Sequence, residues 1–196
     1  MRIAIDTNVL VDCEQAAARA EVLNSLARQG YPRGHELCVP AIVASERGLE
    51  GVLVKNFAEF ESRLSAIGLV DVELLSPMLY LDVCFLGHAL LCNDEMKVLE
   101  QEIHEVLFPS LPFVYADYCA NAGIEPAADR CDRKWRNAKC DVQVVWAHVW
   151  HQTDALVSAD SNMHKTSKKS RLENLTGGRP ILHPNDLPSF LAAAAV

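Results

Sequence analysis

Long apolar runs are missing from this chain of 196 residues. A membrane-spanning helix needs roughly 20 consecutive apolar residues, and no stretch of the sequence approaches that length. The N-terminus also lacks the basic and then apolar layout of a secretory signal, because Asp6 interrupts the first apolar run after a few residues. We therefore expect a cytoplasmic protein with no membrane partner.

Motifs of several common chemistries are missing as well. The seven cysteines contain no CxxC pair and have no matching histidine spacing, so we expect reduced packing residues and no structural zinc. The sequence has no glycine-rich phosphate loop and no nucleophile elbow. His148 and His151 have no evident nucleophile beside them. Histidine-based hydrolysis is therefore not favoured.

An excess of positive charge is absent, since 18 Lys and Arg residues oppose 26 Asp and Glu residues, for a net charge of -8. A protein that simply coats nucleic acid needs a broad basic surface, which this composition argues against. A nuclease remains compatible with it, because such an enzyme can gather carboxylates around cations and keep its basic residues local.

Strand-like and helical segments alternate along the chain. The strand-like runs lie at residues 2–5, before Val39, at 69–77, at 154–160 and at 179–183, and the helical patterns lie at 13–30, after Pro40, at 56–68, at 141–152 and after Pro184. This alternation predicts an α/β fold, with a short, mostly parallel central sheet flanked by helices on both faces.

Two amphipathic helices are predicted between residues 78 and 107. Their apolar positions recur at intervals of three and four residues: Leu79, Val83, Leu86 and Leu90, then Met96, Leu99, Ile103 and Val106. Residues 108–128 contain prolines and read as an irregular or partly helical connection. We predict one domain over residues 1–196 with a helical insertion at about 76–136. Its helices would form extra core, which we favour, or a cap over a site, or a dimer surface.

Acidic residues recur where the predicted strands end. Asp6 follows "RIAI" and Asp160 follows "ALVSA", while Asp141 opens a predicted helix and Glu46 lies in or beside the helix after the second strand. Because ligands bind outside the carboxyl ends of parallel strands, we expect these four carboxylates to share one edge of the sheet. Converging carboxylates repel one another unless cations compensate them.

Oxygen ligands of this kind suit Mg²⁺ or Mn²⁺. Such ions lower the pKa of a bound water and neutralise charge on a phosphoryl group, so the pattern favours phosphodiester hydrolysis. Each residue alone also has a structural explanation: Asp6 and Asp141 as helix N-caps and Glu46 as a solvated helix residue. Their joint placement favours the functional interpretation.

The segments that carry these acids resemble PIN-domain nucleases. The resemblance rests on "IDTNVLVD" at the start, on "ASE" after the second strand and on "CDVQVVWAHVWHQTDALVSADSNM" near the end, and it covers about residues 1–50 and 137–190. It implies a sandwich of helices around a short parallel sheet, a single-strand ribonuclease that depends on Mg²⁺ or Mn²⁺, and four catalytic and metal-binding acids at Asp6, Glu46, Asp141 and Asp160.

The same resemblance implies supporting polar residues and partners. Asn8, Ser158 and Asn162 match positions at which the family carries polar residues beside the acids. Small VapC-like members are toxins held inactive by an antitoxin, so the resemblance implies RNA, an antitoxin and a second copy of the chain as partners. The long middle region departs from the compact toxins.

Basic residues flank two of the acids. Arg130, Arg133, Lys134, Arg136 and Lys139 precede Asp141, and His164, Lys165, Lys168, Lys169 and Arg171 follow Asp160. On one reading they are solvated loops. On the other they bind the phosphate backbone, with Arg133, Lys134, Arg136 and Lys165 as the candidate substrate contacts and Trp135 or a nearby aromatic available to stack a base.

Two other functions stay open. Some Mg²⁺-dependent phosphatases place Asp after their first strand but require D-x-D, whereas Asn8 occupies the second position here. A small-molecule phosphohydrolase would cleave a generic phosphomonoester and not RNA. A non-catalytic PIN-like module that binds RNA or protein would keep binding RNA after metal removal and cleave nothing, but the retention of all four acids weighs against it.

Overall fold

The computed structural model describes residues 1–29, 35–46, 53–126 and 131–193. Its elements, in chain order, are β1 (Arg2–Ile5), α1 (Thr7–Glu14), the 3₁₀ helix η1 (Ala18–Ala20), α2 (Glu21–Gln29), β2 (Glu36–Pro40), the 3₁₀ helix η3 (Ala41–Ser45), α3 (Phe57–Ala66), β3 (Glu73–Leu75), α4 (Asp94–Leu107), α5 (Tyr115–Ala122), α6 (Arg133–Trp150), β4 (Ala155–Val157), α7 (Thr166–Leu175), β5 (Ile181–Leu182), the 3₁₀ helix η4 (Pro184–Asp186) and α8 (Leu187–Ala193).

The strands of the described residues form one parallel sheet in the order β3-β2-β1-β4-β5. β1 lies at its centre, with Ile3 opposite Leu37 of β2 and Ile5 opposite Val157 of β4. The chain builds the sheet outward from β1 on one side and then crosses over to build the other side. The end of β1 is therefore the switch point at which open α/β sheets leave a crevice. The expected α/β fold is confirmed.

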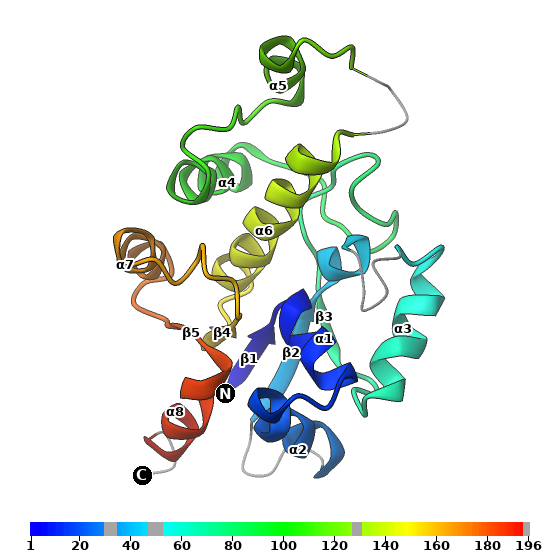
Figure 1. Ribbon diagram of the computed structural model, residues 1–196, viewed down its shortest axis with the longest axis vertical. Helices are drawn as coiled ribbons and strands as arrows, with labels where there is room; N and C mark the ends of the chain where they lie inside the picture. Colours follow the sequence, from blue (N-terminus) through cyan, green and yellow to red (C-terminus); the bar gives the residue numbers. More distant parts are fainter. Residues whose placement is uncertain (30–34, 47–52, 127–130, 194–196) are drawn as a thin grey trace.

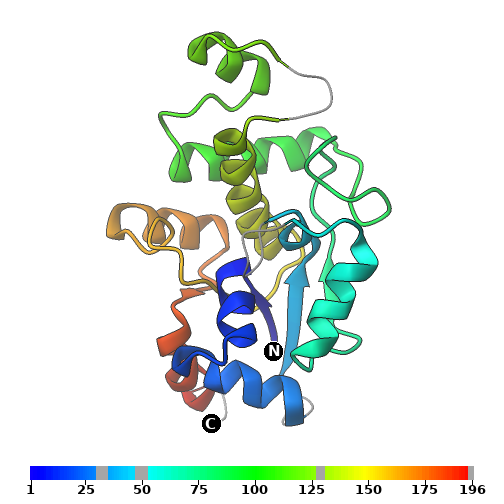
Figure 2. The same ribbon diagram turned by 45° about the vertical axis from the view of Figure 1, so that its right-hand side comes forward.

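Helices cover both faces of the sheet and make a three-layer sandwich (Figures 1 and 2). α1, α2 and α3 lie on one side, and α6 and α7 lie on the other. α4 packs against α6 and α7, while α5 lies farthest from the sheet (Figure 1). In the part of the chain that the structure describes, no helix is both long and apolar enough to cross a membrane.

The sheet and α6 form the centre of the core. Ile5 and every residue of β4 have 0 % exposure, as a parallel sheet covered on both faces requires. The predicted apolar face of α6 is confirmed, since Val142, Val145 and Trp146 are fully buried. The same cluster of apolar contacts includes Met96 and other residues of α4, so the second of the two predicted middle helices is also confirmed.

The prediction of the first middle helix is wrong. Residues 79–90 form a loop instead, which is closed at its base where the N–H of Leu79 donates to the carbonyl oxygen of Leu90 (2.8 Å). Gly87 has a φ of 90°, a conformation that a right-handed helix does not contain. Leu86 is 73 % exposed, so the spaced leucines share no buried face.

The first helix begins earlier than expected. α1 starts at Thr7, directly after Asp6, and ends at Glu14 before η1 and α2 continue, whereas the sequence predicted one helix over 13–30. Ala16, with a φ of 50°, interrupts that stretch. Gly30, the predicted stop, lies outside the described residues.

The helix that carries Asp141 also begins earlier. Asp132 caps α6, because its carboxylate accepts hydrogen bonds from the N–H groups of Lys134 and Trp135. Asp141 therefore lies inside the helix, and the prediction that it opens the helix at the positive end of the dipole is wrong. The sequence favoured the later start because the apolar face of the helix becomes regular only after Asp141.

Two further elements differ from expectation. The segment at residues 161–171 reads from the sequence as a polar basic loop, but residues 166–175 form α7, whose only described buried side chain is Leu172. Such a helix gives no apolar periodicity to detect. The segment after β2 is the short 3₁₀ helix η3, and Glu46 follows its last residue in an extended conformation. Residues 47–52, part of the helix predicted after Pro40, lie outside the described residues.

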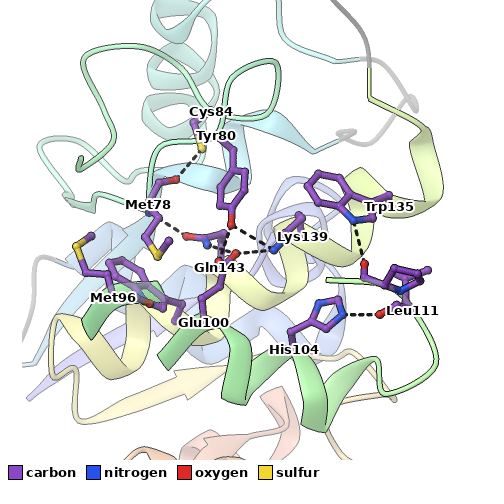
Figure 3. Close-up of polar contacts among 12 residues, drawn as sticks. Met78, Tyr80, Cys84, Met96, Glu100, His104, Leu111, Trp135, Lys139 and Gln143 are labelled. Carbon is purple, nitrogen blue, oxygen red and sulfur yellow. Dashed lines mark hydrogen bonds and ion pairs between the residues drawn. The ribbon is translucent and has the colours of Figure 1, made fainter. Parts of the chain in front are cut away.

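A buried ion pair joins α4 to α6 (Figure 3). The ammonium of Lys139 lies 2.9 Å from Oε1 of Glu100, and both side chains are at most 1 % exposed. The same Oε1 accepts a hydrogen bond from Gln143 (2.9 Å), while Oε2 accepts one from the hydroxyl of Tyr80 (2.5 Å). The Lys139 ammonium also lies 3.7 Å from the ring centroid of Phe113. We call these five residues the Lys139 cluster.

Two basic-region predictions are wrong because of this packing. Lys139 is committed to Glu100 inside the protein and is not available to a phosphate backbone. Trp135 is 3 % exposed, and its indole N–H donates to the carbonyl oxygen of Pro112 (3.2 Å), so it offers no free face to a base.

Candidate active site

Asp6 stands at the carboxyl end of the central strand. Its N–H donates to the carbonyl oxygen of Val157, which continues the pairing of β1 with β4, and its side chain is 3 % exposed. Oδ1 accepts a hydrogen bond from the N–H of Thr7 (2.6 Å), so Asp6 caps α1. Asp6 therefore both caps α1 and lies at the carboxyl edge of the sheet.

Asn8, in the first turn of α1, and Ser158, directly after β4, both hold the side chain of Asp6. Oδ2 of Asp6 accepts hydrogen bonds from the Asn8 amide and from the Ser158 hydroxyl, both at 2.6 Å. The Asn8 amide oxygen in turn accepts a hydrogen bond from the N–H of Ala159 (2.7 Å). The two residues therefore fix the carboxylate and tie the end of β1 to the segment that follows β4.

Asp160 is positioned by the same segment. Its N–H donates to the Ser158 hydroxyl (3.0 Å), and its Oδ1 accepts a hydrogen bond from the N–H of Asn162 (2.8 Å). Because β1 and β4 are adjacent, the expected meeting of Asp6 and Asp160 takes place. Both side chains line one cavity.

Glu46 and Asp141 complete this cavity from two other elements. Glu46 comes from the end of η3, and Asp141 comes from α6, which packs against η3. The cavity has a volume of about 720 Å³, and all four predicted acids line it. We call it the acidic cavity.

The carboxylates in the acidic cavity destabilise one another's charged forms. Burial raises the pKa of Glu46 well above its usual range, and the charges of Asp6 and Asp141 raise it further. Burial also raises the pKa of Asp141 strongly, with Asp6 and Asp160 adding to the effect. The pKa of Asp6 is raised by burial and by Asp160 although its hydrogen bonds oppose the shift. Such a group of acids is stable in its ionised form only beside a cation.

The donor set fits a hard divalent cation. Oε1 of Glu46 and the hydroxyl of Thr7 are both buried without a hydrogen bond of good geometry among the described residues, although the Thr7 hydroxyl lies close enough to lower the pKa of Glu46. Within the described residues, no three His, Cys, Asp or Glu side chains lie in an arrangement that could hold a metal ion as they stand. An open cluster of carboxylates suits Mg²⁺, which keeps several waters and takes only one or two carboxylates directly.

No model of a known protein family matches the chain, and no curated protein matches it. The chemistry of this protein therefore has to be inferred from the arrangement of its own side chains.

The structure separates the predicted substrate contacts into two groups. Lys134 and Lys165 line a second cavity beside the acidic one. Arg133 is exposed on α6 but does not line this cavity, and Arg136 is half-buried, with its Nε buried and without a partner among the described residues. Arg130 lies outside the described residues.

Three charged or amide side chains at the site were not among the predicted site residues. Asp12 and Gln15 line the acidic cavity from α1, and Arg19 pairs with Asp12 through two hydrogen bonds of 2.5 and 2.8 Å. A helix that begins at Thr7 places Asn8, Asp12 and Gln15 on one face, at intervals of four and three residues. The sequence predicted a helix that begins only at residue 13, so this shared face of α1 was not predicted.

Proposed function

We propose that this protein is a divalent-metal-dependent endoribonuclease that hydrolyses phosphodiester bonds of single-stranded or structured RNA. The observation that carries the proposal is the acidic cavity, where carboxylates from four separate segments meet at the switch point of a parallel sheet. The Thr7 hydroxyl interacts favourably with the Glu46 carboxylate, but burial and the neighbouring acids outweigh it and raise the pKa of Glu46. The order of the four acids and the sequence around them also resemble the PIN-domain nucleases.

Asp6, Glu46, Asp141 and Asp160 would hold Mg²⁺ or Mn²⁺. Bound there, the ion supplies positive charge beside the scissile phosphate and makes water more acidic. Asp6 is already oriented by Asn8 and Ser158, so its carboxylate pays little reorganisation when it binds a cation.

The surroundings support RNA over a small phosphomonoester as the substrate. Asn8 uses its amide on Asp6 and on the N–H of Ala159, so the position that carries the second Asp of a D-x-D phosphatase has a positioning role here. The lysine-lined cavity beside the acids offers room for more of a polynucleotide than one phosphate group. An antitoxin and a second copy of the chain remain predictions from the resemblance.

The test is cleavage of labelled single-stranded RNAs and DNAs in Mg²⁺, Mn²⁺ or EDTA. We expect metal-dependent cutting of RNA that Asp6→Asn and Asp141→Asn each reduce by about a thousandfold or more, since each removes a charge that binds the cation. Asp141→Asn is the cleaner variant, because Asp6 also caps α1. Asp117→Asn, on the exposed surface of α5, is the matched control and should cut like the wild type.

Equal cutting by Asp141→Asn and the wild type would refute the four-carboxylate site. Binding of RNA in EDTA without cleavage in any metal would favour the non-catalytic module instead. Hydrolysis of a phosphomonoester without cleavage of RNA would favour a phosphohydrolase.

A further inference from the structure

A second cavity opens beside the acidic cavity and shares Asp141 and Asp160 with it. Its volume is about 660 Å³, within the range of small-molecule sites. Three segments line it: one face of α6, the chain after α4 at residues 107–111, and the segment from Asp160 to Lys168. We call it the lysine cavity.

The face of α6 that lines the lysine cavity is set by helical spacing. Lys134, Asn137, Ala138 and Asp141 follow one another at intervals of three, one and three residues and so share one side of the helix. Arg133 is one residue away from Lys134, which turns its side chain by about 100° around the helix. It therefore points away from this cavity although it is equally exposed and equally charged.

The opposite wall is tied to the acidic cavity. The ammonium of Lys168 donates to the carbonyl oxygen of Leu107 and to Oδ1 of Asn162, both at 2.6 Å. The Asn162 amide donates to the same carbonyl oxygen (3.2 Å), and its N–H donates to Asp160. The end of α4 is thus held against the segment that positions Asp160, so this wall is part of the site and not an independent loop.

The charges of the two cavities differ. In the acidic cavity, Arg19 is neutralised by Asp12. In the lysine cavity, Lys134 and Lys165 form no ion pair with any carboxylate of the described residues. Burial and the charge of Lys165 lower the pKa of Lys168, and the charge of Asp160 only partly opposes the shift. An anionic ligand that reaches the four acids is therefore favoured to continue into the lysine cavity.

The wall after α4 is apolar. Phe108 and Leu111 line the cavity and are both half-buried, so part of each side chain faces the cavity. An aromatic ring beside a set of lysines is the combination that binds single strands, because a base stacks on the ring while the cations hold the phosphate. Any nucleobase can stack on such a ring, whatever its identity.

We propose that the lysine cavity is a nucleotide subsite, which binds the phosphate and base next to the scissile phosphodiester through Lys134 and Lys165 and through the ring of Phe108. This inference rests on the proposed function, because it takes the four acids as the place where the strand is cut. It gives the chain after α4, within the helical middle region, a role in substrate binding.

The test measures binding separately from cleavage. The probe is a fluorescent single-stranded RNA of about 12 nucleotides, within the site sizes of single-strand-binding folds, beside an abasic strand of equal length. Dissociation constants are measured in Ca²⁺ buffer over a salt series with the full-length chain. We expect Lys134→Ala and Lys165→Ala to weaken binding of both strands and to reduce the salt slope by about 0.7 each. Arg133→Ala is the matched control and should bind more like the wild type.

Phe108→Ala tests the base platform. We expect the wild type to bind the RNA about tenfold more tightly than the abasic strand and Phe108→Ala to lose most of that preference, because stacking requires a base. Val114→Ala, an exposed apolar residue at the start of α5, should keep the preference. Thermal melting of each variant checks that it remains folded.

The failures of the two proposals are distinguishable. If Lys134→Ala and Arg133→Ala weaken binding equally, or if Phe108→Ala keeps the base preference, the nucleotide subsite is wrong even when the wild type cleaves RNA. If the lysine and phenylalanine variants behave as expected but no metal supports cleavage, the subsite stands and the endoribonuclease proposal fails.

Discussion

The acidic cavity and the Lys139 cluster are two groups of buried or half-buried charged side chains that differ in how far their charges are compensated. In the Lys139 cluster, both oxygens of Glu100 accept hydrogen bonds and an ammonium lies 2.9 Å away. In the acidic cavity, four carboxylates face one another, and the Thr7 hydroxyl does not offset the effect of burial and neighbouring acids on Glu46. The Lys139 cluster is complete as the chain folds, whereas the proposed function assigns a cation to the acidic cavity.

This difference distinguishes charged side chains that are buried to stabilise the fold from those that are buried where a ligand can bind. A buried charge costs several kcal/mol unless it is paired and hydrogen-bonded, so an uncompensated buried acid either takes up a proton or binds a ligand that supplies the missing charge. Carboxyl groups whose pKa values are raised by burial and by one another, inside a cavity, are therefore candidates for chemistry. The Lys139 cluster, by the same reasoning, should matter for stability and not for cleavage.

The largest effect on stability is expected when the buried ion pair is broken. Lys139→Met leaves the charge of Glu100 inside the protein without a cation and should lower the free energy of unfolding by about 3–5 kcal/mol at neutral pH. Urea unfolding followed by circular dichroism measures it. The double variant Lys139→Met with Glu100→Gln removes both charges and keeps a hydrogen-bond acceptor, so it should recover most of the loss.

The same substitution at a half-buried pair on the surface of α7 is the control. Lys169→Met removes the surface partner of Glu173, at 3.8 Å on α7, and should change the free energy of unfolding by less than about 1 kcal/mol. If Lys139→Met is as mild as Lys169→Met, the buried pair does not hold α4 to α6. If the double variant is as unstable as the single one, lost packing and not the uncompensated charge is the cause.

The next effect is the response of the acidic cavity to pH and metal. The pKa values of Asp6, Glu46 and Asp141 are raised in the folded state. Each of these acids therefore binds its proton more tightly in the folded than in the unfolded protein. Their protonation stabilises the fold fully at a pH below the unfolded-state pKa values, and this stabilisation is lost as the pH rises through the folded-state pKa values. In EDTA we therefore expect the melting temperature to fall as the pH rises above the ordinary pKa range of carboxyl groups. Mn²⁺ at about 100 times its dissociation constant should restore about 2.7 kcal/mol.

Glu46→Gln should flatten this dependence, because it removes one of the mutually repelling carboxylates. Glu61→Gln, an exposed residue of α3, should leave the slope of the wild type unchanged. Calorimetric melting across the pH range in EDTA and in Mn²⁺ distinguishes them. Equal slopes for Glu46→Gln and the wild type would show that Glu46 is compensated within the protein and has no need of a cation.

The acidic cavity was largely predictable from the sequence, whereas the Lys139 cluster was not. Asp6 and Asp160 each follow an apolar run, and parallel strands bring such residues to one edge whatever lies between them. The pair of Glu100 and Lys139 joins two helices that are distant along the chain. Neither residue differs, as a sequence letter, from an ordinary solvated charge, so only the packing of α4 on α6 reveals their burial.

The errors at the site have one physical origin. Helix starts were inferred from where apolar periodicity becomes regular, but α1 and α6 begin earlier, where Asp6 and Asp132 cap them. Because α1 starts at Thr7, Asp12 lines the acidic cavity. Because α6 starts at Arg133, Lys134 lines the lysine cavity and Arg133 does not. A cap followed by a polar first turn has no apolar periodicity. The sequence therefore does not show where such a helix begins, and without that boundary the directions of its first side chains do not follow either.

The smallest expected effect separates the two regions most cleanly. Tyr80→Phe removes the hydroxyl that donates to Oε2 of Glu100 while keeping the ring, and should lower the free energy of unfolding by about 1.5 kcal/mol, since the partner is a buried charge. Tyr118→Phe removes a similar hydrogen bond, to the half-buried Asp132, where water can replace it, and should cost clearly less.

Neither variant should change the rate of RNA cleavage, because neither hydroxyl lines the acidic cavity or the lysine cavity. A loss of cleavage in Tyr80→Phe with unchanged stability would show instead that the Lys139 cluster acts through α6 on Asp141, and the division between a structural and a functional group of charges would then fail.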